Sequence, residues 1–289
     1  MLFLFKKQRK EEERMKKIFV LFVLAVTSLG LTACQRTEAI DPDHVTRITV
    51  GLEAAYAPFN WTTTTAGEFT HPLFGQSGTY ADGYDVVIAQ IIAEALGAEL
   101  VIKQIDWDGL IPSLDSGNID LIIAGMSPTP TRAESVLFTN EYFRSEQVMV
   151  VLNTGNFAHA TSLADFAGAR VVAQQGTLQD DLIDQIPSVN HLTPLSTYAF
   201  LLQEVVSQTA DAFVAELPVA QAMVATNSNL HIVQFAEGQG FTVTDEEVIV
   251  SIALRLIDVA LRDRINEILA GITMSQRTAM MTAALNRQP

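Results

Sequence analysis

The sequence has little with which to cross-link itself or to bind nucleic acid. Its 289 residues include a single cysteine, Cys34, so no internal disulfide can stabilise the fold. Only 18 Lys and Arg stand against 33 Asp and Glu, a balance that disfavours phosphate-bearing partners such as nucleic acid and anionic lipid headgroups. The five histidines show no metal-ligand spacing, and no hydrolase triad is evident. The fold must therefore be stabilised by its hydrophobic core.

A mostly apolar stretch from Ile18 to Leu31 lies shortly before the cysteine. Two lysines precede this stretch, and the small residues Thr32 and Ala33 follow it. These are the charged, hydrophobic and cleavable parts of a secretory signal. The stretch is shorter than the ~20 residues of a membrane-spanning helix, and polar residues follow Cys34. A spanning helix or a buried thiol is the weaker interpretation.

The segment resembles the signal of bacterial lipoproteins. In that family Leu31-Thr32-Ala33-Cys34 would be the lipobox, with cleavage before Cys34 and lipid attached to it. The resemblance implies a signal peptide over residues 1–33 and a polar tether over 34–46. Glu11-Glu12-Glu13 places acid where a signal is basic. We therefore expect translation to start at Met15.

The chain after Cys34 is strongly acidic and long enough for two lobes. Seven of the 18 basic and three of the 33 acidic residues precede Cys34, which leaves a net charge of about −19. Strand-like and helix-like patterns alternate, which predicts an α/β fold with mainly parallel sheets flanked by helices. Strands are expected at 47–52, 100–105, 119–124, 147–152, 169–173, 191–195, 210–215, 230–233 and 247–254, and helices at 85–96, 107–116, from Pro130, 179–186, 198–207, 218–227 and 256–285.

The alternation repeats after residue 160, which predicts two lobes. Residues 47–148 plus 247–289 would form a discontinuous first lobe, and residues 149–246 the second. A chain that crosses twice between lobes makes a hinge, and a hinge makes a cleft. The segment Thr62 to Asp82 is expected to be a long loop whose role the sequence does not define.

Several motifs, in order along the chain, resemble the polar amino acid solute-binding proteins of ABC importers. The family fold is the type II periplasmic binding protein, in which two α/β lobes close on a ligand. The resemblance covers nearly the whole chain after Cys34. It rests on Gly51 to Phe59, Gly83-Tyr84-Asp85, Asp106 to Leu114, Gly117 to Asp120, Ala124 to Arg132, Gln175-Gly176-Thr177 and Asp211 to Pro218.

Thr129, Pro130 and Arg132 predict an anion site. Thr129 suits a helix N-cap and Pro130 the first helical position. Backbone N–H groups at a helix start attract a carboxylate, and a guanidinium adds a bidentate pair. The resemblance implies that Arg132 binds the α-carboxylate of the ligand, that Ser127 contributes its N–H or hydroxyl, and that Gly125 offers its carbonyl to the α-ammonium.

The second lobe should supply the opposite wall. The resemblance implies main-chain contacts from Thr177 and Leu178 to the carboxylate. Glu216 stands where the family usually has an aspartate that binds the α-ammonium, so it keeps the charge with a longer reach. Gln174 occupies a position that relatives vary to suit their ligand. Taken alone, the glycine before Thr177 is equally typical of a plain β-to-α turn.

Glu53, Tyr56 and Trp107 point into the cleft by the same resemblance. Flat aromatic rings can sandwich an aliphatic stem or stack on a guanidinium, and Glu53 can pair with a cationic tip. Core packing is the alternative for the two aromatics. Acid at Glu53, with no basic residue at these positions, favours arginine or lysine over glutamine or histidine.

The resemblance implies a lipoprotein, not an enzyme, that delivers an amino acid to a permease pair and its ATPase. No metal or organic cofactor is implied, and a monomer is expected. The expected location is the outer face of the cell membrane, with a Gram-positive envelope favoured and the periplasm as the Gram-negative equivalent. Two alternatives stay open. A cyclohexadienyl dehydratase-like enzyme would use Glu53 or Glu216 for proton transfer, and an amino acid sensing domain would report to a receptor.

Overall fold

The computed structural model describes residues 38–289. The predicted signal segment, the start at Met15 and the lipidation of Cys34 lie outside these residues and stay predictions. Over the described range, no helix is long and apolar enough to cross a membrane. In the same part of the chain, no group of three or more His, Cys, Asp or Glu is placed to hold a metal ion.

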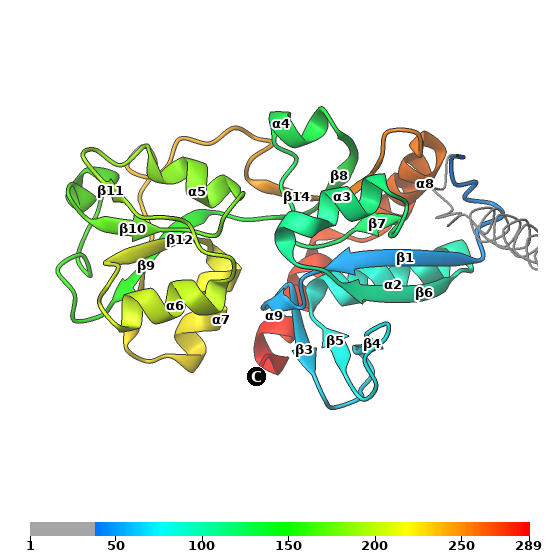
Figure 1. Cartoon of the computed structure of the whole chain (residues 1–289), viewed down its shortest axis with the longest axis horizontal. Coiled ribbons are helices and arrows are strands. Elements are labelled where there is room, and N and C mark those ends of the chain that lie inside the picture. The colour runs from blue at the N-terminus through cyan, green and yellow to red at the C-terminus, as the bar shows by residue number, and fades with distance from the viewer. Residues whose placement is uncertain (1–37) are drawn as a thin grey trace, which may run out of the picture. The chain divides into compact units, whose positions relative to one another are not determined.

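Five strands form the first sheet, and we call the part of the chain built on it the first lobe (Figure 1). The first strand of the described range, β1, pairs in parallel with its two neighbours. Strand β14, which follows the second lobe in sequence, pairs antiparallel with β7 and β8. Five of the six residues of β1 are buried, because elements cover both faces of the sheet. The strand order is β6 (Glu99–Gln104), β1 (Arg47–Leu52), β7 (Leu121–Ile122), β14 (Ile249–Arg255) and β8 (Val136–Arg144).

The second sheet has five strands and the same plan, and it defines the second lobe. Two ladders are parallel and two are antiparallel. The mixed α/β prediction is confirmed, and the parallel pairing applies to three neighbouring strands of each sheet. The order is β11 (Asn190–His191), β10 (Arg170–Val172), β12 (Ala212–Glu216), β9 (Gln147–Leu152) and β13 (Leu230–Val233).

Helices flank both sheets and occur close to the predicted positions. The longest helix before the crossing, α2 (Tyr84–Leu96), ends at Gly97 in the left-handed conformation, with φ 64°, which glycine adopts most readily. The others are η1 (Trp107–Gly109), α3 (Leu110–Asp115), α4 (Pro130–Ala133), η2 (Leu163–Phe166), α5 (Leu178–Ile183), α6 (Tyr198–Val206), α7 (Leu217–Thr226), α8 (Val259–Ala270) and α9 (Met274–Arg287).

The chain crosses between the sheets through two segments that touch. The N–H of Ser145 donates to the carbonyl of Val248 over 2.9 Å, which joins the outgoing and returning crossings. Strand β9 begins at Gln147 and pairs entirely within the second sheet. The expected lobe boundary after residue 148 therefore falls inside a strand, and the outgoing crossing lies at residues 145–146.

Strand β8 and the C-terminal helices are among the elements that differ from the sequence predictions. Strand β8 was not predicted, because its buried residues Val136, Thr139 and Tyr142 recur every third position and not every second. Register shifts against β14 disturb the alternation. The single helix expected over 256–285 is two, because Thr273 starts a new helix through a capping box with Gln276.

The segment expected as a long loop forms a small antiparallel sheet attached to the first lobe. Arg287 near the C-terminus pairs with Asp82 over 2.9 Å, and its guanidinium lies 4.2 Å from the ring centroid of Phe69. Leu73, 2% exposed, packs in the first-lobe core. These contacts hold the segment against the core and the C-terminal helix of the first lobe. The strand order is β2 (Ala55–Tyr56), β3 (Asn60–Thr63), β5 (Tyr80–Asp82) and β4 (His71–Pro72).

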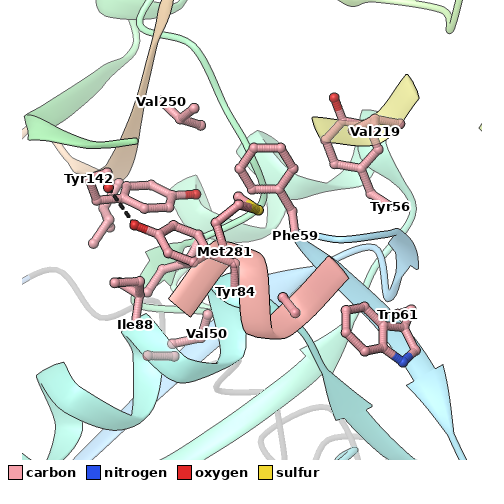
Figure 2. Close-up of a cluster of buried hydrophobic side chains, with 14 of the residues drawn as sticks. Val50, Tyr56, Phe59, Trp61, Tyr84, Ile88, Tyr142, Val219, Val250 and Met281 are labelled. Carbon is pink, nitrogen blue, oxygen red and sulfur yellow. Dashed lines mark hydrogen bonds between the residues drawn. The ribbon is translucent and has the colours of Figure 1, made fainter. Parts of the chain in front are cut away.

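A cluster of aromatic rings lies in the hydrophobic core and includes the cleft residue Tyr56 (Figure 2). Tyr56 stacks on Phe59 with the ring centroids 5.4 Å apart, and Tyr84 stacks on Tyr142 at 5.8 Å. The hydroxyl of Tyr84 donates to the backbone carbonyl of Tyr142 over 2.7 Å. Since aromatic side chains bury large apolar areas, this cluster stabilises the core of the first lobe.

Candidate ligand-binding site

Arg132 lies where the sequence predicted an anion site. The hydroxyl of Thr129 accepts from the backbone N–H of Arg132, and Pro130 occupies the first position of the single turn α4. The guanidinium lies 5.0 Å from the ring centroid of Trp107 and donates to the carbonyl of Ser127 over 2.9 Å. Burial lowers the pKa of Arg132 to about 10. The group therefore stays charged at neutral pH and lies over an aromatic ring.

Glu53 follows strand β1 and is 7% exposed. Its side chain accepts from Nε2 of Gln174, on the second lobe, over 2.9 Å. Burial raises the pKa of Glu53 to about 7, an effect that the bond from Gln174 partly opposes. A carboxyl with this pKa is partly protonated at neutral pH, so an approaching cation would favour its ionised form.

A tight turn before α5 is one of the places where the second lobe contacts the first. Gly176 has φ 68°, and its carbonyl accepts from Nε1 of Trp107 and from Nη2 of Arg132, both over 3.1 Å. Thr177 caps α5 by accepting from the N–H of Asp180. The turn therefore presents the carbonyl of Gly176 to the first lobe, and the main-chain contacts from Thr177 and Leu178 to a ligand carboxylate stay predictions.

Glu216 ends strand β12 and is 2% exposed. The hydroxyl of Tyr56 donates to its carboxylate, so the two lobes are also joined here. Burial raises the pKa of Glu216 to about 7, and the bond from Tyr56 acts in the opposite direction. The structure thus places Glu216 behind Tyr56, and its contact with a ligand ammonium stays a prediction.

One cavity brings the predicted residues together. Its lining includes every residue predicted for ligand binding except Glu216. The open volume is about 10 Å³, roughly the space of one water molecule. A larger cleft of about 520 Å³ adjoins it and shares Trp107, Arg132, Thr177 and Leu178. The predicted residues in the smaller cavity are Glu53, Tyr56, Trp107, Gly125, Ser127, Arg132, Gln174, Thr177 and Leu178.

Sequence reasoning missed two residues of this cavity, Gln179 and Tyr198. Gln179 directly follows Leu178 and donates to Oε1 of Gln147 over 3.0 Å, so its place beside a predicted residue was the available signal. Tyr198 begins α6, and its ring lies 4.9 Å from that of Tyr56. The local sequence around Tyr198 is that of an ordinary helix start. Its place at the cleft depends on how the second lobe folds, which no local pattern shows.

The arrangement suits a small molecule with several charges. A fixed guanidinium can bind a carboxylate, and two buried carboxyls can accept cationic groups once ionised. Groups from both lobes line the same cavity. These features define a two-lobed solute-binding protein.

The chain belongs to the bacterial extracellular solute-binding proteins, family 3, which it matches over residues 48–283. It is 29% identical over 260 residues to the arginine-binding extracellular protein ArtP of Bacillus subtilis, covering 88% of this chain and 92% of that protein. A probable histidine-binding protein of Campylobacter jejuni is 30% identical over 239 residues, 79% of this chain and 85% of the relative.

The fold is similar to that of a solved amino acid ABC transporter substrate-binding protein from Streptococcus pneumoniae, crystallised with L-arginine. The TM-score is 0.73 at 24% identity, over 83% of this chain and 94% of the other. The family model confirms the predicted family, and this likeness confirms the two-lobed fold.

Proposed function

We propose that this protein is the amino acid-binding component of an ABC importer and that its ligand is arginine, with lysine next, ahead of glutamine and histidine. The observation that carries the proposal is a single cavity lined by the Arg132 guanidinium, stacked on Trp107, and by the Glu53 carboxyl. An amino acid with a cationic tip offers the complementary charges, a carboxylate for Arg132 and a cation for Glu53. The name of the relative from Bacillus subtilis supports this choice.

The ligand would be held by groups from both lobes. Arg132 and Ser127 bind the α-carboxylate together with the turn at Thr177 and Leu178. The carbonyl of Gly125 and the carboxylate of Glu216 receive the α-ammonium. Glu53 pairs with the tip, while Tyr56 and Trp107 flank the stem and Gln174 adjusts the fit.

Capture requires the lobes to separate and close. The cavity is too small for arginine as it stands, and contacts such as Gln174 to Glu53 join the two lobes. Hinge motion at the crossings near Ser145 and Val248 would open the site. Ligand binding then favours the closed form, because only that form offers both walls, and a permease pair with its ATPase receives the closed protein.

The test is calorimetric titration of residues 35–289, unfolded and refolded to remove carried ligand, against the common amino acids. Binding of arginine or lysine in preference to neutral and acidic amino acids supports the proposal. Silence across the panel contradicts it. In that case conversion of a cyclohexadienyl acid, followed by ultraviolet absorbance, would support the dehydratase-like alternative, for which two buried carboxyls with pKa about 7 are suited.

We further propose that lipid on Cys34 anchors the protein as a monomer to the outer face of the cell membrane. Its supports are the lipobox-like Leu31-Thr32-Ala33-Cys34 and the membership of an extracellular family. A fatty acid label should enter the wild-type protein, and Cys34→Ser should abolish labelling and release the protein from membranes. Retention of the variant in the membrane fraction would overturn the anchor.

A further inference from the structure

The motif Gly83-Tyr84-Asp85 has no place in the ligand cavity, yet it contains a fully buried acid. Asp85 is 0% exposed and lies in the first turn of α2. Burying a carboxylate is unfavourable unless it is paired or strongly hydrogen-bonded. Among the described residues, no ion pair involves Asp85. Burial raises its pKa to about 6, and bonds from Tyr142, Asn60 and the backbone N–H of Gly125 oppose that rise. Each carboxylate oxygen accepts from a side-chain donor, an arrangement that favours the ionised form.

Two side chains donate to this carboxylate. Nδ2 of Asn60 donates to Oδ2 over 2.7 Å, and the hydroxyl of Tyr142 donates to Oδ1 over 2.7 Å. Each donor also accepts from a backbone N–H. Oδ1 of Asn60 accepts from Ala54 over 2.8 Å, and the hydroxyl oxygen of Tyr142 accepts from Gly125 over 3.1 Å.

The ionised carboxylate sets the direction of both chains of hydrogen bonds. A carboxylate only accepts, so the amide of Asn60 must turn its NH₂ towards Asp85 and its oxygen towards Ala54. The hydroxyl hydrogen of Tyr142 must likewise point at Asp85, which leaves a lone pair for Gly125. A neutral amide in place of Asp85 can both donate and accept, and it would no longer enforce either direction.

The network ends at the backbone N–H groups of Ala54 and Gly125, which lie beside or within the predicted ligand site. Ala54 follows Glu53 and has φ 54°, an uncommon value for a residue other than glycine. Gly125 has φ 63°, and a Cβ there would come within 2.8 Å of the ring of Tyr56. The conformation at Ala54 is therefore unfavourable without a stabilising contact, whereas Gly125 tolerates its φ and is restricted by the close ring of Tyr56. Tyr142 packs within the aromatic cluster that supports this network (Figure 2).

We propose that Asp85 is a positioning residue of the ligand site, which fixes the backbone at Ala54 through Asn60 and at Gly125 through Tyr142. The inference rests on the proposed function. The Gly125 arm places the carbonyl that receives the α-ammonium, and the Ala54 arm places Glu53 opposite the cationic tip. The network thereby sets the spacing between the two ends of the ligand.

Selectivity separates this role from a structural one. The wild type and the variants Y142F, N60L and D85N are titrated with three probes: L-arginine, 5-guanidinopentanoic acid, which lacks the α-amino group, and L-citrulline, which has a neutral tip. Y142F should weaken arginine about tenfold and the probe without the amino group less than twofold. N60L should reduce the preference for arginine over citrulline several-fold, and D85N should reduce both preferences.

The matched control is T139V, which removes another buried hydroxyl of strand β8, the one that accepts from the backbone N–H of Ile252 over 3.0 Å and contacts no member of the network. It should lower the melting temperature and leave both preferences unchanged. If Y142F, N60L and D85N also change only the melting temperature, the positioning role is overturned while arginine binding stands. Y142F and N60L keep the test decisive should D85N fail to fold. A wild type that binds no amino acid overturns the proposed function, and the positioning role with it.

Discussion

The two walls of the cleft are built differently. The first lobe presents charged and aromatic side chains, Glu53, Trp107 and Arg132, and buried hydrogen bonds hold the backbone beside them. The second lobe meets them with the backbone of one turn, whose Gly176 carbonyl accepts from both Trp107 and Arg132, and with the uncharged side chain of Gln174. We therefore expect the first lobe to determine which ligand binds, and the contacts of the second lobe to stabilise the closed form.

Removing the main charge of the first wall should have the largest effect. Arg132→Ala deletes the charge-assisted pair with the ligand carboxylate, and we expect binding to weaken by about 3 kcal/mol, roughly 100-fold. Titration calorimetry with L-arginine measures it. Arg264→Ala, an exposed arginine of the first lobe in a pair with Glu267, is the matched control and should bind normally. Equal affinities for both variants would remove Arg132 from the site.

A buried acid of the second wall should appear in the pH dependence of stability. Burial raises the pKa of Glu216 from 4.5 to about 7. The folded state then binds more protons than the unfolded state, so the contribution of this group to the free energy of unfolding falls as pH rises from about 4.5 to about 7. Glu216→Gln should remove about 1–3 kcal/mol of that decline.

Urea denaturation at pH 5 and pH 8 measures this slope. The exposed Glu237 of the second lobe supplies the control Glu237→Gln, which should keep the wild-type slope. A Glu216→Gln protein with the same slope as the wild type would show that burial does not raise the pKa of Glu216.

Glu53 tests whether the first wall also distinguishes between ligands. Glu53→Gln keeps the shape and the partner Gln174 but removes the charge, so arginine should lose about 1.5–2 kcal/mol, roughly 10- to 30-fold. Citrulline should change little. Calorimetry with both ligands gives the comparison, and equal losses would contradict a pairing of Glu53 with the cationic tip.

The smallest effect on ligand affinity is expected at the turn of the second lobe that contains Gly176, which we call the closing turn. Gly176→Ala places a Cβ 3.2 Å from Oδ1 of Asp108, at a φ of +68°, so the closed form should lose about 1 kcal/mol and the affinity roughly fivefold. Stopped-flow fluorescence should show faster dissociation.

Gly168→Ala is the matched control for the closing turn. Its φ is +76° with nothing within 4 Å of the added carbon, so it has the same backbone penalty without touching the cleft. It should lower stability and leave affinity unchanged. If both glycine variants bind like the wild type, the turn at Gly176 does not report closure.

Much of the fold could be read from local pattern. The bounds of β1, β9 and β13 agree with the predicted strands, because short apolar runs between helices are distinctive. Strand β8 escaped prediction, since its bulges against β14 replace strict alternation with a three-residue spacing. The break between α8 and α9 was present in the sequence as Thr273 and Gln276, a capping box that the helical pattern concealed.

The site divides in the same way. Thr129, Pro130 and Arg132 form a local motif, and the structure gives it the predicted helix start. The positions of Tyr198 and of the Asn60–Asp85–Tyr142 network depend on contacts between distant segments. Asp85 and Tyr142 are 57 residues apart, and Tyr56 and Glu216 are 160 apart. No periodicity within a segment encodes such a pairing.

The sequence by itself determined the class of fold, the family and the residue types available for a cationic amino acid. The class of fold follows from local periodicity and turn chemistry, and the family from the resemblance that the ordered motifs carry. Only the tertiary structure decided which acid faces the cavity and which lies behind Tyr56, because both walls assemble from segments that meet after folding. It also decided the role open to Asp85, since the value of a buried carboxylate depends on the donors that the rest of the fold brings to it.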